Sequence, residues 1–255
     1  MNAAFVYFYD EFLSDPRYER ELSLMENELA VRGISGTIVR LTVFRDDLST
    51  LKNRISNGAK NLIFVGNDAT IEKMMRLVPE NPDLTLGFLP LMEKSAMGRL
   101  LGMPAGAQGV EVLAARLVET IDLGRVADRY FLTECVVTGA GAQLEIEGQY
   151  RLAPLVGGAI AVRNLGSPTA EGNPLADPKD GKLEAVIQAP ISTKSGLWNK
   201  QELTETRIPL TFGRILAKKQ ISVFIDGKEY IGTEFPLGIA PRRLKIITGR
   251  NRRLA

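Results

Sequence analysis

The sequence predicts two domains of different class. Residues 1–125 form an N-terminal α/β domain with a parallel sheet, and residues 126–255 form a C-terminal antiparallel β-sandwich domain. The basic C-terminal tail is a candidate to return to the first domain. Three observations support this division. Apolar runs alternate with helical periodicity in the first half, the helical pattern stops near residue 125, and short β-rich runs separated by turn signals follow. Strict alternation of strand and helix is typical of a parallel sheet covered on both faces.

The first half contains four apolar runs that predict strands: "AAFVYFY", "GTIVRLTVF", "NLIFVG" and "LTLGFLP". Four segments between or after them have helical character. One lies near residues 47–58, and the other three carry apolar side chains on one face: Tyr18, Leu22, Met25 and Leu29; Ile71, Met74, Met75 and Val78; Val110, Leu113, Ala114 and Leu117.

The second half contains β-rich runs punctuated by Gly-Gly, Asn-Pro, Asp-Pro and Asp-Gly pairs, which favour turns. Cys135 lies inside one of these apolar runs, which predicts a buried core residue. The runs are "YFLTECVVTG", "AQLEIEG", "GAIAVRN", "KLEAVIQAP", "TRIPLTF", "QISVFIDGKEYIG" and "RRLKIITG".

Composition excludes several kinds of chemistry. The chain has 255 residues, a single cysteine and no histidine. This rules out a Ser-His-Asp triad, a Cys-His pair and a histidine-ligated zinc site. Carboxylates, lysines, hydroxyls, backbone amides and an oxygen-bound metal such as Mg²⁺ remain. No apolar run approaches the roughly 20 residues that span a bilayer, so we expect a cytoplasmic protein.

Charge is distributed unevenly although the net charge is only +2. The first 30 residues are rich in carboxylates, and the C-terminal segment "APRRLKIITGRNRRLA" has six basic residues and no acidic one. Nucleic acid, anionic lipid headgroups or simple solubility would each explain this basic tail. The tail has no interleaved aromatic residues and the chain no recognised nucleic-acid motif, which disfavours nucleic acid.

The stretch "FVGNDATIEKM", residues 64–74, predicts a buried strand that runs into a helix through a tight loop. Ligands of open parallel sheets bind beyond the carboxyl ends of the strands, which places the loops 8–16, 66–70 and 90–97 on one edge. Structural interpretations are also open: Asp68 as the N-cap of the helix near Thr70, and Lys73 and Lys94 as ordinary surface lysines.

The order of several segments resembles the diacylglycerol kinase catalytic domain, which is related to sphingosine kinases and more distantly to NAD kinases. The resemblance runs from about residue 60 to the end of the chain. It implies ATP- and Mg²⁺-dependent phosphoryl transfer to a lipid hydroxyl. The segments are "NLIFVGNDATIEKM", "LGFLPLMEKSAMGRLLGMP", "IDLGRVADRYFLT", "DPKDGKLEAVI" and "ISVFIDGKEYIG" with "RRLKII".

In that family a GGDGT loop follows the central strand. The aligned residues 66–70 keep the first glycine, the aspartate and the threonine, but Asn67 and Ala69 replace two glycines. Glycine lets backbone amides approach phosphate oxygens closely. Asn67 reproduces this freedom only in part, and Ala69 hardly at all. The family's GTGND loop is replaced by residues 92–96, where Glu93 adds a negative charge. The resemblance implies nucleotide contacts from Gly66, Asn67, Asp68, Thr70, Lys94 and Ser95.

The resemblance also implies roles for carboxylates. Asp122 opens an intact Asp-Leu-Gly segment, and Asp226 begins a segment in which Lys228 replaces the family's glutamate and Glu229 comes one position later. Glu229 can substitute only if the turn is re-registered, since one residue of slip turns a strand side chain to the other face. Without the family, the Asp-Gly pair at 226–227 is equally well a hairpin turn. The implied magnesium ligands are Asp122 and Asp226, and the implied catalytic residues are Asp68, Asp226 and Glu229.

Two functional hypotheses stay open. The first is a lipid kinase that uses ATP and Mg²⁺ to phosphorylate a lipid or another small hydroxyl-bearing substrate. The second is a catalytically inactive relative that binds a lipid, a nucleotide or a protein. The basic tail predicts peripheral contact with anionic membranes, and a homo-oligomer is compatible with the sequence.

Overall fold

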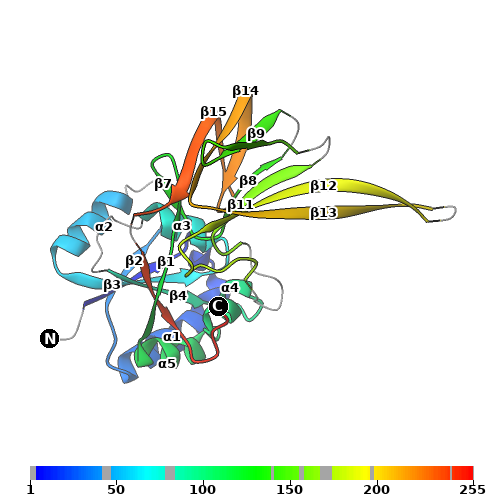
Figure 1. Ribbon diagram of the computed structural model, residues 1–255. Helices are drawn as coiled ribbons and strands as arrows, with labels where there is room; N and C mark the ends of the chain where they lie inside the picture. Colours follow the sequence, from blue (N-terminus) through cyan, green and yellow to red (C-terminus); the bar gives the residue numbers. More distant parts are fainter. Residues whose placement is uncertain are drawn as a thin grey trace. The chain divides into compact units, whose positions relative to one another are not determined.

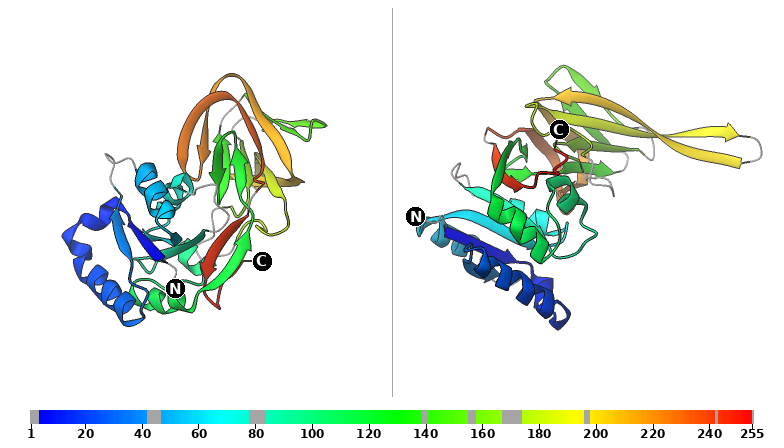
Figure 2. Two further views of the ribbon diagram at one scale, coloured as in Figure 1. Left: turned by 90° about the vertical axis from the view of Figure 1, so that its left-hand side faces the viewer. Right: turned by 90° about the horizontal axis from the view of Figure 1, so that it is seen from below.

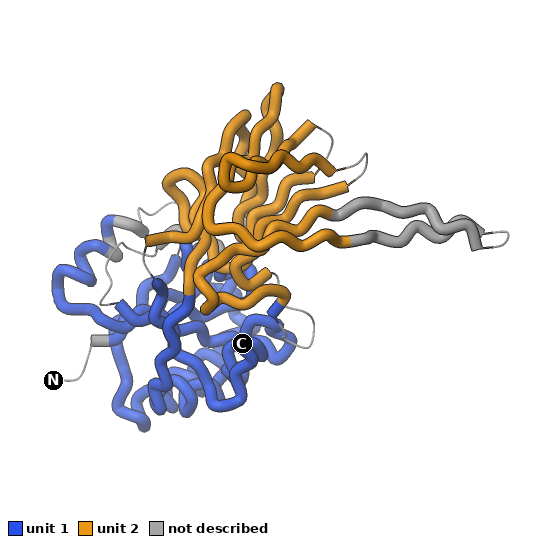
Figure 3. Tube along the Cα trace, viewed as in Figure 1, with its two compact units in different colours: residues 1–121, 168–174, 242–255 blue, residues 122–167, 175–241 orange. Residues whose placement is uncertain are grey.

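The computed structural model describes residues 4–41, 47–77, 84–138, 141–154, 158–166, 174–195, 198–241 and 243–254. The chain divides into two compact units (Figure 3). Unit 1 comprises residues 1–121, 168–174 and 242–255, and unit 2 comprises residues 122–167 and 175–241. The prediction of an α/β half followed by an antiparallel β half is confirmed by the two separate sheets.

Unit 1 contains a six-stranded sheet in the order β2-β1-β3-β4-β16-β5. The first five strands in this order run parallel to one another. The last strand, β5, is antiparallel to β16. The strands are β1 (Ala4–Tyr9), β2 (Thr37–Arg40), β3 (Ala59–Gly66), β4 (Thr85–Pro90), β5 (Leu117–Ile121) and β16 (Leu244–Thr248).

Helices cover both faces of this sheet (Figures 1 and 2). Helices α1 and α5 contact each other on one face, and α2 and α3 lie together on the other. The core is aromatic at its centre, where Phe8 of β1 stacks on Phe64 of β3 with 5.1 Å between ring centroids. The helical elements are η1 (Glu11–Ser14), η2 (Pro16–Tyr18), α1 (Glu19–Val31), α2 (Asp47–Ser56), α3 (Thr70–Leu77), α4 (Ala96–Leu101) and α5 (Ala107–Ala115).

The predicted helix that was to include Leu117 ends earlier. Helix α5 stops at Ala115, and Arg116 adopts a left-handed conformation with φ 51°. Its guanidinium group donates to Asn61 Oδ1, and Leu117 then begins strand β5. The expected helical position of Val78 and the end of the second predicted strand, residues 42–44, lie outside the described residues.

The basic C-terminal segment is partly a strand of unit 1. Strand β16 pairs in parallel with β4 and antiparallel with β5. Beyond it, Arg252 forms an ion pair of 2.5 Å with Glu119, and the backbone N–H of Arg253 donates to Leu100. The backbone of this segment is therefore part of unit 1, while the side chains of Arg243, Lys245, Arg250 and Arg253 are exposed.

Unit 2 is an antiparallel sheet in which β14 pairs with β15, β8 and β9, so hydrogen bonds link all of its strands. The long strands β12 and β13 pair from Leu183 opposite Leu210 to Ser195 opposite Trp198. The strands are β6 (Gly124–Val126), β7 (Arg129–Phe131), β8 (Glu134–Thr138), β9 (Ala142–Ile146), β10 (Tyr150–Leu152), β11 (Ala159–Arg163), β12 (Leu183–Ser195), β13 (Trp198–Leu210), β14 (Phe212–Ile225) and β15 (Lys228–Ile239).

The core of unit 2 is one cluster of apolar side chains that includes Phe131, Val137, Ile160 and Val223. Cys135 is fully buried in this cluster, as predicted. Burial raises the pKa of its thiol, so the reactive thiolate form is disfavoured. Cys135 is therefore a core residue in this unit.

Candidate functional site

The predicted site residues fall in both units, and each set is described within its own unit. In unit 1, strands β1, β3 and β4 are adjacent and parallel, so their carboxyl ends lie on one edge of the sheet. Two backbone hydrogen bonds fix the segments that leave this edge. Asp10 donates to Val65 O at 3.0 Å, and Leu91 donates to Gly66 O at 2.9 Å.

Asp68 uses its carboxylate to cap helix α4. Oδ1 accepts from the Ser95 hydroxyl at 2.5 Å and from Met97 N at 3.3 Å, and Oδ2 accepts from Ala96 N at 2.8 Å. Ser95 Oγ in turn accepts from Gly98 N at 2.7 Å, as an N-cap residue does. From the sequence we expect Asp68 to cap the helix that begins near Thr70, which is α3. Its carboxylate instead caps α4.

Three backbone amides of the loop between β3 and α3 find acceptors within the loop itself. Asn67 N donates to Thr70 Oγ1 at 2.9 Å, and Ala69 N donates to Asn67 Oδ1 at 3.0 Å. Thr70 N donates to Asn67 O at 2.9 Å. These are amides that a phosphate-binding loop would direct at its ligand, and here side chains and carbonyls of the loop accept from them.

Gly66 is required by a close contact within the protein. A Cβ atom at this position would lie 2.1 Å from Thr70 Oγ1 and 3.1 Å from the Asp10 Cβ. Gly66 is buried at the end of β3, so neither neighbour can easily give way. The glycine that the family resemblance assigns to nucleotide binding thus has a packing explanation.

We expect Gly66→Ala to lower the free energy of unfolding by about 2–3 kcal/mol, because an added methyl group in a packed site forces its neighbours apart. Urea denaturation measures this. Combining Gly66→Ala with Thr70→Ala removes the hydroxyl that the methyl would strike, so the double variant should lose less than the sum of the single losses. Equal stability of Gly66→Ala and the wild type would contradict this packing argument.

Sequence reasoning missed Asp10. Its side chain is buried, with 5% exposed, and its carboxylate accepts from the Thr70 hydroxyl at 2.8 Å. It also forms an ion pair with Lys73, so this lysine is not an ordinary surface lysine. Lys94, which follows strand β4, is exposed. An aspartate that directly follows a buried strand is the signal that could have identified Asp10.

The segment after β1 borders an acidic hollow of about 450 Å³, formed with α1 and Arg40. Its carboxylates include Asp15, Glu19 and Glu26. Asp15 accepts from Arg17 N at 3.0 Å, and Glu26 accepts from the Tyr9 hydroxyl at 3.1 Å. This negative charge is opposite to what an anionic phosphate requires.

In unit 2, Asp226 and Gly227 form a two-residue hairpin turn between β14 and β15. Both residues have positive φ, 46° and 86°, as a type I′ turn requires. The Asp226 carboxylate accepts from Leu132 N at 2.8 Å, Thr133 N at 2.8 Å, Thr133 Oγ1 at 2.5 Å and Glu134 N at 3.3 Å. Burial raises its pKa, and these hydrogen bonds oppose that effect. Its oxygens already serve as acceptors for the protein itself.

Glu229 and Asp122 have different surroundings within unit 2. Glu229 lies opposite Phe224 in the regular part of the β14–β15 ladder next to the turn and is exposed, so the turn is not re-registered. Asp122 is buried, and its Oδ2 accepts from Gly181 N at 2.9 Å. The roles that the resemblance implies for Glu229, Asp122 and Asp226 remain predictions.

The residues of the loop at 66–70 fit the phosphates of a nucleotide poorly. In the loop at 66–70, side chains of the protein accept hydrogen bonds from the backbone amides of Asn67 and Ala69. The Asp68 carboxylate accepts from Ala96 N at the start of α4. Among the residues that the structure describes, no group of three carboxylate or cysteine side chains is arranged to hold a metal ion. Magnesium at a nucleotide site is usually held by one or two carboxylates together with the phosphates of the nucleotide, so the fit is decided by the loop that would receive those phosphates.

Solved structures of diacylglycerol kinases share this architecture. A diacylglycerol kinase from Bacillus anthracis str. Sterne is similar with a TM-score of 0.74 and 14% identity, and a putative diacylglycerol kinase from the same organism with a TM-score of 0.76 and 12% identity. Each comparison covers 97% of both chains. No protein-family model and no curated protein matches the sequence.

The chain therefore has the two-part fold of diacylglycerol kinase-like proteins, as the resemblance predicted. At these identities the likeness establishes the fold, and activity has to be argued from the residues. No helix in the described part of the chain has the length and apolar character needed to cross a bilayer.

Proposed function

We propose that this chain is a lipid-binding protein built on the diacylglycerol kinase fold, which does not transfer phosphoryl groups from ATP. The fold, shared with diacylglycerol kinases over 97% of the chain, supports a lipid as the ligand class. One observation carries the loss of nucleotide use. In the loop that corresponds to the family's phosphate loop, side chains of the protein itself accept the hydrogen bonds that a phosphate would need.

The energetics favour this proposal. A phosphate would have to displace the Asp68 carboxylate from Ala96 N and the Asn67 side chain from Ala69 N. The hydrogen bond to the Asp68 carboxylate is charge-assisted and contributes about 1.5–3 kcal/mol, and the neutral one to Asn67 contributes about 0.5–1.5 kcal/mol. Losing both contributions weakens a micromolar site by about 30- to 2,000-fold, toward the millimolar range.

A working lipid kinase is the second candidate, with ATP and Mg²⁺ as cofactors. The order of the retained residues favours it: Asp68 and Thr70 follow Gly66 as in the family loop, and Asp122-Leu123-Gly124 is intact. In this candidate Asp68 would leave α4 when nucleotide binds, and Asp226 and Glu229 would act on the acceptor hydroxyl.

Calorimetric titration with ATP and Mg²⁺ separates the two candidates. For the wild type we expect no saturable binding at concentrations up to about 1 mM. We also expect little thermal stabilisation, because a ligand present at its dissociation constant adds only about 0.4 kcal/mol. Asp68→Ala, checked for folding by circular dichroism, should behave like the wild type in the titration.

Saturable micromolar binding by the wild type that Asp68→Ala abolishes would overturn the proposal and make the kinase the leading reading. A glycine-restored variant, Asn67→Gly with Ala69→Gly, probes the same loop. If the native side chains are what excludes phosphate, this variant should bind ATP more tightly than the wild type does.

A further inference from the structure

Strand β14 contains a large bulge in unit 2. Leu216 pairs with Glu234 and Ile221 with Gly232, so residues 217–220 lie opposite the single residue Thr233. The bulge is also where β14 changes partner on its other side, from Ala142 of β9 to Val137 of β8. Bulges of this kind re-aim side chains and are frequent next to binding sites.

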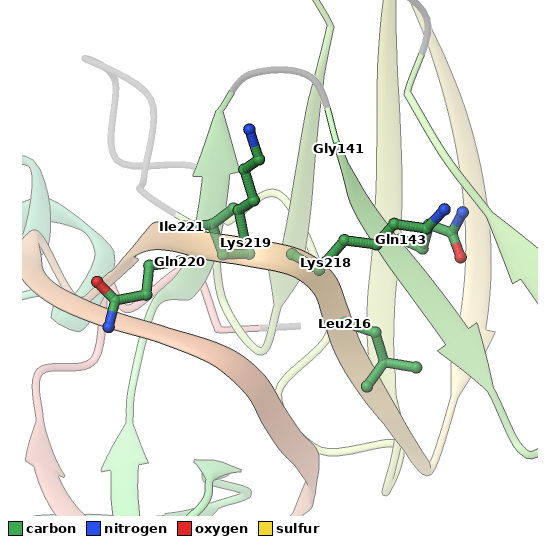
Figure 4. A pocket seen from close by; sticks show the side chains of 8 residues that line it. Gly141, Gln143, Leu216, Lys218, Lys219, Gln220 and Ile221 are labelled. Atoms are coloured by element: carbon green, nitrogen blue, oxygen red, sulfur yellow. The ribbon is translucent and has the colours of Figure 1, made fainter.

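A hollow of about 590 Å³ lies at this bulge (Figure 4). Its volume is within the range of about 300–1,000 Å³ that is typical of small-molecule sites. Leu216, Ala217 and Ile221 give it an apolar wall, and all three are only partly buried. Ile221 also packs against the core of the unit, which gives this wall a rigid support.

Two lysines border the hollow. Lys218 and Lys219 are exposed, and in the described part of the chain neither has an ion pair or a hydrogen bond from its ammonium group. In Figure 4 the Lys218 side chain extends toward Gln143, and Gln220 leaves the strand on the side away from Lys219. The hollow thus combines an apolar wall with two available cations and the amide group of Gln143.

Nearby carboxylates do not neutralise these lysines. Glu145 of β9 accepts from Arg151 at 3.0 Å and from Arg214 at 3.0 Å, and Arg214 also pairs with Glu234 at 3.5 Å. The two arginines lower the pKa of Glu145, which therefore stays ionised and paired at neutral pH. Two arginines and two carboxylates balance within this cluster, so Lys218 and Lys219 add uncompensated positive charge beside the hollow.

We propose that the hollow at the β14 bulge binds a single-chain anionic amphiphile, with the acyl chain against Leu216, Ala217 and Ile221 and the headgroup at Lys218 and Lys219. The headgroup is a carboxylate or a phosphate, as in a fatty acid or a lysophosphatidic acid. Long lysine side chains suit this arrangement because their stems cover apolar surface while their ammonium groups meet the anion. This inference rests on the proposed lipid-binding function and gives that function a location and a charge preference.

The test is calorimetric titration of the full chain with oleate and with oleoyl lysophosphatidic acid, both below their critical micelle concentrations. We expect saturable binding of at least one, which identifies the headgroup. Lys218→Ala with Lys219→Ala should weaken it at least tenfold, and Leu216→Gln should weaken it through the apolar wall. Lys182→Ala, an exposed lysine elsewhere in unit 2, is the matched control and should bind as the wild type does.

Three results would overturn the inference. Unchanged binding in the lysine pair variant would place the amphiphile elsewhere and leave the proposed lipid-binding function standing. Equal binding of inorganic phosphate would mean that the acyl chain plays no part. Binding only to anionic vesicles of phosphatidylglycerol, with none to the monomeric amphiphiles, would mean a membrane-facing surface in place of a pocket. Absence of any lipid binding, together with tight ATP binding, would instead reject the proposed function itself.

Discussion

Asp226→Ala is expected to lower the free energy of unfolding by about 3–5 kcal/mol, measured by urea denaturation. The Asp226 carboxylate is the acceptor for three backbone N–H groups and one hydroxyl on residues 132–134. Alanine leaves these donors without their partner, and a buried donor left unsatisfied costs about 1–3 kcal/mol. Water can restore a part of this, which is why the expected loss is smaller than the sum of four such terms.

A second variant separates the hydrogen bonds from the backbone conformation. Asp226 has a φ of 46°, which costs alanine about 1–2 kcal/mol but costs glycine little. The free energy of unfolding of Asp226→Gly should therefore exceed that of Asp226→Ala by about 1 kcal/mol, because only the backbone strain is relieved. Asp180→Ala is the control, because its exposed carboxylate accepts only from Lys182 N in the described structure and should contribute less than 1 kcal/mol.

The outcome also bears on the implied catalytic role. A carboxylate held for chemistry can usually be removed at little cost in stability, because its oxygens are kept available for a substrate or metal. If Asp226→Ala is within 1 kcal/mol of the wild type, the four hydrogen bonds contribute little and a catalytic or metal-binding role gains weight. A large loss makes Asp226 first of all a structural residue that fixes the β14–β15 turn to the segment before β8.

The features that sequence alone predicted are those that depend on local patterns. The apolar runs identified β1, β3 and β4, because a strand buried on both faces is apolar along its whole length. The Asp-Gly pair at 226–227 identified a hairpin turn, since both positions need positive φ. The apolar run around Cys135 likewise predicted burial.

The features that sequence alone missed depend on contacts between distant segments. Asp68 caps a helix that begins 28 residues later, a choice that is made only when the ends of β3 and β4 come together. A return of the C-terminal tail to the first domain is expected from the sequence, but no local pattern shows that β16 pairs with β4 and β5. The ion pair between Asp10 and Lys73 spans 63 positions, and nothing in either segment predicts it.

Asp10→Ala is expected to lower the free energy of unfolding by about 2–4 kcal/mol. The buried carboxylate accepts from the Thr70 hydroxyl and forms an ion pair with Lys73. Removing one member of a buried charge pair leaves the other without compensation. The loss should be at the lower end of what a fully buried pair costs, because 28% of the Lys73 side chain is exposed and its ammonium group can reach water.

A double-mutant cycle tests whether Asp10 acts through Thr70. We expect Asp10→Ala and Thr70→Val to show a coupling of about 1–2 kcal/mol, because Thr70 Oγ1 donates to Asp10 Oδ2 and at the same time accepts from Asn67 N. The matched pair is Asp10→Ala with Asp180→Ala, which lies in the other unit and should be additive.

A coupling near zero would mean that Thr70 finds another acceptor when Asp10 is absent, so that the loop at 66–70 does not depend on β1. The expected coupling means the opposite. The carboxylate at the end of β1 would then hold the Thr70 hydroxyl, and this hydroxyl would hold the first amide of the loop. Such a chain of contacts, running from Asp10 through Thr70 to the Asn67 amide, would explain physically why this amide is not available to a ligand.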